Sequence, residues 1–168
     1  MSPGGGMDLS DLDGKAKIYR VENPERLIEE VIRGYVRESS ANRLLHFGGE
    51  PIFDDPLIGF ADGDDPLFVE YKKVVHEEHF TPREILMKHL AQSLKNENPQ
   101  IASVSVISYV LPANRETLRS NAAEKEGPSL RWNHTRWRGQ DFIDALSAHM
   151  VALLEDLGAG DVTTEAPV

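Results

Sequence analysis

Arginine and tryptophan side chains gather in one polar stretch of this sequence, residues 113–139. A guanidinium binds carboxylates and phosphates through paired hydrogen bonds, and an indole ring offers a surface for stacking. One interpretation is therefore a loop that binds an anionic or flat ligand. The other is a surface loop whose tryptophans anchor it to the core and whose arginines pair with nearby acids. The candidate ligand-binding residues are Asn121, Arg131, Asn133, His134 and Arg136.

Two other groups of side chains invite a metal interpretation but lack the required spacing. His76 and His79 are three residues apart, whereas the zinc-protease pattern places two histidines four apart on one helix. The aspartates from Asp62 to Asp65 resemble a calcium loop, but the twelfth position counted from Asp62 is Lys73, where a calcium loop has a glutamate. The sequence therefore predicts turn, cap and helix-end roles for these residues, and no metal site.

The common catalytic and nucleotide-binding motifs do not occur in the sequence. It contains no Gly-Lys-Ser/Thr P-loop, no Gly-x-Gly-x-x-Gly and no Gly-x-Ser-x-Gly elbow. It also contains no cysteine, so it supplies no thiolate for an iron–sulfur cluster, a Cys-type zinc site, a disulfide or nucleophilic catalysis. The sequence therefore predicts no cofactor held by this chain alone and identifies no catalytic acid–base pair.

Composition indicates one acidic globular domain. The 168 residues are 40% hydrophobic, enough for a core, and carry 28 Asp and Glu against 18 Lys and Arg, a net charge of -10. Nucleic-acid-binding surfaces are basic, so this balance argues against such a partner. No segment approaches the roughly 20 apolar residues of a membrane span, and the start lacks the regions of a signal peptide. We expect a cytoplasmic protein with a flexible lead over 1–22 and a single domain over 23–168.

Capping residues and apolar spacing predict four helices. Asn23 begins a helix over about 24–38 whose apolar stripe lies in the core. Asp65 begins a second helix, Thr81 begins a third through a capping box, and a last helix ends at Gly158. The apolar residues assigned to the buried face of the second helix are Leu67, Phe68, Tyr71, Val74 and Val75.

The strand pattern is sparser than the helix pattern. Leu57–Ala61 and Ile101–Leu111 are predicted as buried strands, 161–164 as the start of another, and 39–56 as a long loop. Alternating helices and strands favour an α/β class. We predict a small layered domain with a mixed sheet flanked by about four helices. Because so few strands make an incomplete sheet, we expect a partner, a second copy or a further segment to complete it.

Two strings of residues resemble a known family. Pro56–Phe68 and His79–Leu86 are similar to the N-terminal part of epoxyqueuosine-reductase-like iron–sulfur proteins, relatives of corrinoid reductive dehalogenases. The resemblance extends over roughly 24–168. The further matching segments are Ser103–Pro112, Glu116–Asn121, Arg131–Arg136, and the last helix through Gly158 to Ala166–Pro167.

The resemblance implies an α/β domain that packs beside a ferredoxin-like segment carrying Cys-x-x-Cys-x-x-Cys-x-x-x-Cys-Pro. In the better-known members a cobalamin lies between the two, so cobalamin and 4Fe–4S clusters are implied for full-length relatives only. The present chain has no cysteine. We therefore expect the cluster-bearing segment to lie beyond Val168 or on a separate partner, or the chain to be a relative that has lost its redox centre.

Three functions are consistent with these observations. The first is the N-terminal domain of an iron–sulfur oxidoreductase-like protein, inactive alone and competent with a Cys-rich ferredoxin-like partner or C-terminal segment. The second is a non-catalytic binding or assembly domain that forms homo-oligomers. The third is a corrinoid or anionic small-molecule binder that uses residues 113–139.

Overall fold

A computed structural model describes residues 22–94 and 100–164 of the chain. The predicted lead over 1–22 lies outside these ranges apart from Glu22. The described residues form five α-helices and two separate two-stranded antiparallel sheets. The α/β class is confirmed, although two antiparallel sheets stand in place of the single mixed sheet that was expected. In the described part of the chain, no helix combines the length and the apolar character needed to cross a bilayer.

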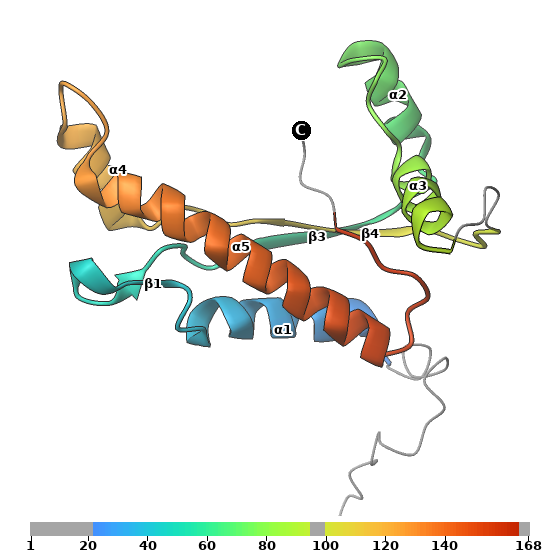
Figure 1. Ribbon diagram of the computed structural model, residues 1–168, viewed down its shortest axis with the longest axis horizontal. Coiled ribbons are helices and arrows are strands. Elements are labelled where there is room, and N and C mark those ends of the chain that lie inside the picture. Colours follow the sequence, from blue (N-terminus) through green and yellow to red (C-terminus); the bar gives the residue numbers. More distant parts are fainter. Residues whose placement is uncertain (1–21, 95–99, 165–168) are drawn as a thin grey trace, which may run out of the picture.

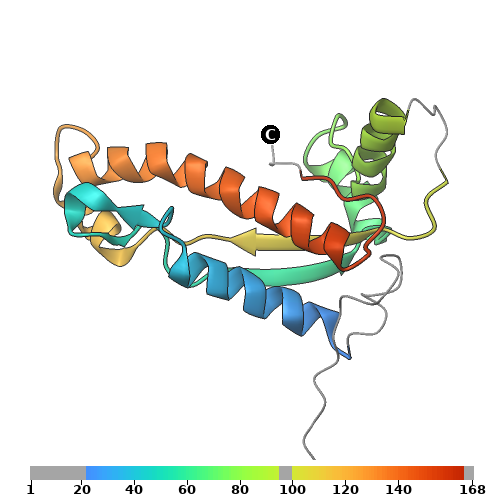
Figure 2. The ribbon, with the colours of Figure 1, turned by 60° about the horizontal axis from the view of Figure 1, so that its bottom comes forward.

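Two helices form the centre of the fold (Figure 2). Helix α1 (Pro24–Glu38) begins where predicted, because the Asn23 side chain accepts a hydrogen bond from the backbone N–H of Arg26 at 2.9 Å. Helix α5 (Leu130–Asp156) lies along α1. The two helices share a core of buried side chains. These are Ile28, Ile32 and Val36 of α1, and Phe142, Leu146 and Met150 of α5.

The second layer is an antiparallel pair of strands, β3 (Leu57–Asp62) and β4 (Ser105–Val110). Alternate side chains of both strands pack against the α1–α5 core. The side chains between them face away from the helices, and Leu57 is 64% and Val110 57% exposed. Both strands were predicted as buried, but helices cover only one of their faces. The inward side chains are Ile58, Phe60, Ile107 and Tyr109.

A short hairpin occupies the region that was predicted as a loop over 39–56. Strand β1 (Arg43–Leu44) pairs antiparallel with β2 (Glu50–Pro51), and the 3-10 helix η4 (Leu45–Phe47) lies between them. The hairpin packs against α5. The pattern was missed because strands of two residues are too short to show periodicity.

Helices α2 (Pro66–Val74) and α3 (Pro82–Leu94) form an arm that projects from one end of the β3–β4 pair (Figure 1). Both predicted helix starts are confirmed. The Asp65 side chain accepts the backbone N–H of Leu67 at 2.8 Å. Thr81 accepts the N–H of residue 84 at 3.3 Å, while the Glu84 carboxylate accepts the N–H of Thr81 at 2.7 Å.

The buried face predicted for α2 is wrong. No residue of α2 is buried, and Leu67, Val74 and Val75 are 52%, 69% and 62% exposed. Helical spacing identified the apolar side chains correctly. It could not show whether another element covers them, because a core helix and a docking helix have the same pattern.

The polar stretch over 113–139 is mostly helical rather than a loop. It contains α4 (Arg115–Ala123) and the first turns of α5. Each helix has a side-chain cap, since Asn114 accepts the N–H of Glu116 at 3.0 Å and Ser129 accepts the N–H of Trp132 at 3.1 Å. At the other end of α5, Gly158 has a φ of 80°, as expected for a helix stop. Residues 161–164, predicted as a strand, are irregular.

Candidate functional site

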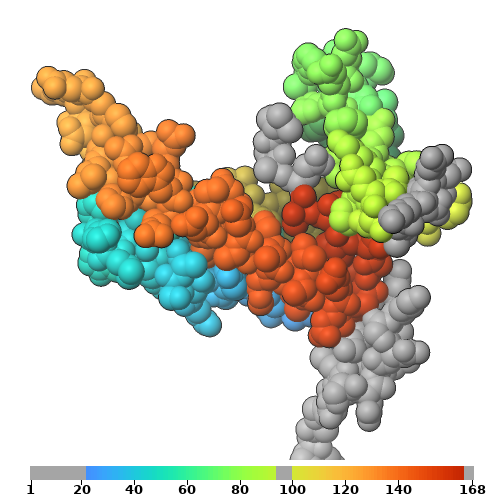
Figure 3. Space-filling view, in the orientation of Figure 1, coloured from blue at the N-terminus to red at the C-terminus, as the bar shows by residue number. Residues whose placement is uncertain are grey.

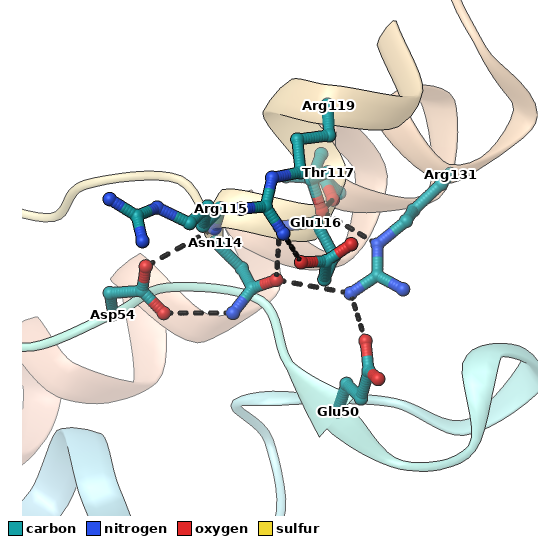
Figure 4. Close-up of polar contacts among 9 residues, drawn as sticks. Glu50, Asp54, Asn114, Arg115, Glu116, Thr117, Arg119 and Arg131 are labelled. Carbon is teal, nitrogen blue, oxygen red and sulfur yellow. Dashed lines mark hydrogen bonds and ion pairs between the residues drawn. The ribbon is translucent and has the colours of Figure 1, made fainter.

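The polar cluster around Arg131 joins three elements of the fold (Figure 4). Arg131 Nε donates a hydrogen bond to Thr117 Oγ1 at 3.0 Å, and one terminal nitrogen donates to Asn114 Oδ1 at 3.2 Å. The same terminal nitrogen forms an ion pair with Glu50 Oε2 at 2.5 Å. The Arg131 side chain is 10% exposed and that of Glu50 48%. This guanidinium therefore links α5 to α4 and to β2.

Asp54 fastens the start of α4 to the segment that precedes β3. Its Oδ1 accepts a hydrogen bond from Asn114 Nδ2 at 2.8 Å, and its Oδ2 accepts the backbone N–H of Arg115 at 3.2 Å. The backbone N–H of Asp54 donates to Pro112 O at 2.9 Å. Throughout the described ranges, no buried side-chain nitrogen or oxygen lacks a hydrogen-bond partner. The buried polar atoms of the cluster therefore already have hydrogen-bond partners within the fold, and none is left unpaired for a ligand.

Only two of the five predicted ligand-binding residues come together. Arg131 and His134 both approach the Phe47 ring, the guanidinium at 5.5 Å and the imidazole at 5.5 Å between ring centroids. His134 also contacts the rings of His46 and Trp137, at 5.3 and 5.9 Å. These rings gather where η4 meets the first turns of α5.

The other three predicted residues lie apart from this cluster. Asn121 Oδ1 accepts the backbone N–H of Ser129 at 3.0 Å, which closes the turn between α4 and α5. Arg136 is exposed on α5, and Asn133 is half-buried there. Asn121 therefore has a structural role, and the contacts of the described residues do not connect all five predicted residues.

The interpretation of 113–139 as arginines paired with acids is partly confirmed. Arg119 pairs with Glu116, and Arg138 lies 3.5 Å from Asp141. Arg131 pairs instead with Glu50, which no sequence pattern indicated because the two residues are distant in the chain. The anchoring role predicted for the tryptophans is wrong for Trp137, which is 69% exposed.

A surface hollow of about 240 Å³ lies beside the ring cluster. His46, Phe47 and His134 line it, with Arg43 and Arg138 among its other lining residues. A hollow of this size is smaller than most small-molecule sites. The guanidinium expected to bind an anion, that of Arg131, is already paired with Glu50. The geometry therefore gives the small-molecule interpretation little support.

The histidines and aspartates considered as metal ligands have local roles. His76 Nδ1 accepts the backbone N–H of Glu78 at 3.3 Å just after α2, and His79 is exposed. Asp62 Oδ1 accepts the N–H of Asp64 at 2.9 Å in the turn before α2. Over residues 22–94 and 100–164, no three His, Cys, Asp or Glu side chains are grouped as a metal site would require.

Ion pairs link α2 to α3 and link α3 to the turn that follows β3. Hydrogen bonds from Arg83 to the Asp64 carboxylate, at 2.5 and 2.6 Å, lower the pKa of Asp64. The Lys72 ammonium lies 2.6 Å from Glu84 and, together with the Thr81 N–H, lowers the pKa of Glu84. Both carboxylates are therefore charged at neutral pH.

Exposed large apolar side chains are most numerous on the arm. We define the α2 surface as the exposed apolar side chains of α2 and the turn that follows it. Figure 3 shows this part standing clear of the α1–α5 body. It contains Leu67, Val69, Tyr71, Val74, Val75 and Phe80, of which all but Tyr71 are more than half exposed.

Sequence reasoning assigned four of these six residues, Leu67, Tyr71, Val74 and Val75, to a buried face, and did not consider Val69 or Phe80 there. The exposure of several large apolar side chains on one short helix is the feature of the fold that most resembles an interaction surface. No protein-family model, curated protein or solved structure matches this chain. The geometry of the described residues is therefore what indicates its function.

Proposed function

We propose that this chain is a non-catalytic binding domain that associates with another protein unit through the α2 surface. The observation that carries the proposal is the exposure of Val74 and Val75, at 69% and 62%, on a helix with no buried residue. Covering each such side chain contributes about 1.5–3 kcal/mol when burial is complete. Covering several of these side chains therefore favours association.

The open face of β3–β4 supports the same function. One face of the β3–β4 pair packs on the α1–α5 core, and covering the other face would bury further apolar surface. Leu57 and Val110 lie opposite each other on the uncovered face, at 64% and 57% exposure. The β3–β4 pair runs between the arm and α4 (Figure 1). A protein unit bound to α2 could therefore also cover the strands.

The test is a charge placed on the α2 surface. A Leu67→Glu/Val74→Glu variant is expected to lose association, because a buried carboxylate without a partner is strongly unfavourable. The matched control is Gln92→Glu, which adds a charge at an exposed position of α3. Light scattering gives the mass, with circular dichroism to show that each variant is folded. The proposal fails if the wild type remains an 18.8 kDa monomer at about 100 µM and also does not bind the ferredoxin-like unit described below.

We propose, as a second candidate, that the partner unit is a Cys-rich ferredoxin-like one, as the resemblance to epoxyqueuosine-reductase-like proteins implies. The supporting observation is where the exposed apolar residues lie in the sequence. The strings that carry the resemblance, 56–68 and 79–86, contain the exposed side chains of Leu57, Leu67 and Phe80. The chain supplies no thiolate, so the partner would carry the 4Fe–4S clusters.

Co-expression with a ferredoxin-like unit that carries the Cys motif tests this candidate. Co-purification with cluster absorbance is expected for the wild type and for Gln92→Glu, and not for Leu67→Glu/Val74→Glu. If the wild type does not retain the unit, the iron–sulfur proposal is rejected. Gel filtration with cobalamin tests the corrinoid alternative, in which an unchanged spectrum of the protein peak would exclude binding.

A further inference from the structure

The two ends of the molecule carry opposite charge. From residue 62 to 84, around the α2 surface, there are seven Asp and Glu against three Lys and Arg. From 113 to 139, in α4 and the start of α5, there are six Lys and Arg against three Asp and Glu. Because the chain as a whole has a net charge of -10, the second segment is a local exception.

Both ends also expose apolar side chains. We define the basic end as the exposed apolar residues of η4, α4 and the start of α5, together with the arginines beside them. Trp137 and Leu130 of this end are 69% and 66% exposed. Tryptophan and arginine are the side chains most often found at the centre of protein interfaces. The basic end consists of Leu45, Leu118, Leu130 and Trp137 with Arg115, Arg136 and Arg138.

We propose that the α2 surface of one copy docks on the basic end of a second copy of this chain. The inference rests on the proposed function and names its partner. Glu77, beside the α2 surface, and Arg136, at the basic end, have no ion pair with any described residue. Each end therefore has exposed apolar side chains and a charged group whose sign is opposite to that at the other end.

The shape of the molecule allows the contact to close. The arm and α4 lie at opposite ends of the long axis (Figure 1). Two copies side by side in opposite directions place each arm against the other copy's basic end, related by a two-fold axis. Such a dimer covers the α2 surface and the basic end of both copies. An open chain of copies would leave an α2 surface exposed at one end and a basic end exposed at the other.

The sign of the salt dependence is the first test. Repulsion between two chains of net charge -10 would make association stronger as salt screens it. Attraction between the acidic and basic ends has the opposite dependence. We expect the dimer dissociation constant, from sedimentation equilibrium, to rise at least about tenfold between about 0.05 and 0.5 M NaCl. A constant that falls or stays unchanged would overturn the inference.

Charge exchange between two variants is the second test. Glu77→Arg/Glu78→Arg and Arg136→Glu/Arg138→Glu are each expected to be monomeric at concentrations where the wild type is dimeric. Mixing them should restore the dimer, because both contacts of a mixed pair are attractive. An arginine-bearing α2 surface meets a glutamate-bearing end, and an unchanged α2 surface meets an unchanged basic end. The control is Glu25→Arg/Glu38→Arg, at exposed positions of α1, which changes the net charge by as much as Glu77→Arg/Glu78→Arg and should leave the dimer intact.

The outcomes separate this inference from the proposed function. If both charge variants remain dimeric, or the mixture stays monomeric, the second-copy contact is wrong. If the wild type is monomeric yet binds the ferredoxin-like unit through the α2 surface, the proposed function stands and the second-copy inference falls. Salt-sensitive dimers that the mixture restores, and that Leu67→Glu/Val74→Glu abolishes, support both.

Discussion

Arg131 shows how a side chain suited to anion binding can serve the interior of a protein. Its guanidinium donates to Thr117 and Asn114 and pairs with Glu50, so its hydrogen-bonding capacity is used within the fold. Thr117 is fully buried, and its hydroxyl depends on this donor and on Thr135. Removing the guanidinium therefore leaves polar groups without partners in a place that water reaches poorly.

We predict that Arg131→Ala lowers the free energy of unfolding by about 2 kcal/mol. Breaking a fully buried ion pair costs about 3–5 kcal/mol, and the value here is smaller because Glu50 is half exposed. Arg136→Ala is the matched control on the same helix and should change stability by less than about 0.5 kcal/mol. Urea denaturation measures both. Equal effects of the two substitutions would show that the links from Arg131 to α4 and β2 do not stabilise the fold.

Residue type alone predicted which side chains in 113–139 were chemically notable, but not their partners. The acids expected to pair with these arginines were nearby in sequence, and Asp141 does lie beside Arg138. The buried Arg131 instead pairs with Glu50, and these two residues come together only in the folded chain. Contacts of this kind depend on tertiary packing, which spacing in one sequence does not encode.

Helix starts were predictable because a cap is a contact between neighbours in the chain. Asn23, Asp65 and the Thr81–Glu84 box all make the expected hydrogen bonds. Helix α4 was missed because its one fully buried side chain, Thr117, is polar and leaves no apolar stripe. The Asn114 cap was the available signal. Caps therefore located helices more reliably here than hydrophobic periodicity did.

The turn between β3 and α2 depends on a glycine at one position. A Cβ on Gly63 would lie 2.5 Å from Val104 Cγ1 and 2.7 Å from its Cβ, and the Gly63 N–H donates to Val104 O at 2.8 Å. We predict that Gly63→Ala destabilises the protein by about 1–3 kcal/mol, because the arm must shift to relieve the overlap. Gly59→Ala is the control, since a Cβ on Gly59 of β3 meets nothing within 4 Å. Thermal denaturation that shows no difference between the two would contradict this packing.

The ion pairs of the arm predict a loss of stability in acid. Asp64 and Glu84 have lowered pKa values because Arg83 and Lys72 stabilise their charged forms. Groups with a lowered pKa in the folded state stabilise the fold above their unfolded pKa and lose that effect as pH falls through the folded value. We expect helical signal and melting temperature to be steady down to about pH 5 and to decline below about pH 4.

The Asp64→Asn/Glu84→Gln variant separates these two groups from the other carboxylates. It should melt at a lower temperature than the wild type at pH 7 and approach the wild type as pH falls to about 3. The measurement is a series of thermal melts by circular dichroism. If the difference between the two proteins does not depend on pH, these ion pairs do not support the arm.

At the scale of the whole molecule, the fold divides into a packed body and a projecting arm. The sequence predicted a single small sheet, whereas the structure has two separate two-stranded sheets and leaves one face of β3–β4 uncovered. The sequence did not indicate the arm, because the apolar residues of α2 have the spacing of a core helix. The apolar spacing predicts a helix face that another element covers, and that element can belong to the same chain or to a second one. The acidic and basic ends favour the second arrangement.

Amide hydrogen exchange should reveal the arm as a separate unit of stability. The body is held by buried residues such as Ile32 and Phe142, which are 0% exposed, whereas α2 has none and depends largely on polar links such as that of Lys72 to Glu84. In dilute solution we expect amides of α2 to exchange through openings at least about 2 kcal/mol less costly than those of α1 and α5. At concentrations where two copies pair, α2 protection should rise while that of the α1–α5 core stays unchanged, because docking stabilises only the helix it covers. Protection of α2 equal to that of the core in dilute protein would mean that the arm is fully supported within one chain, and that its apolar side chains need no partner.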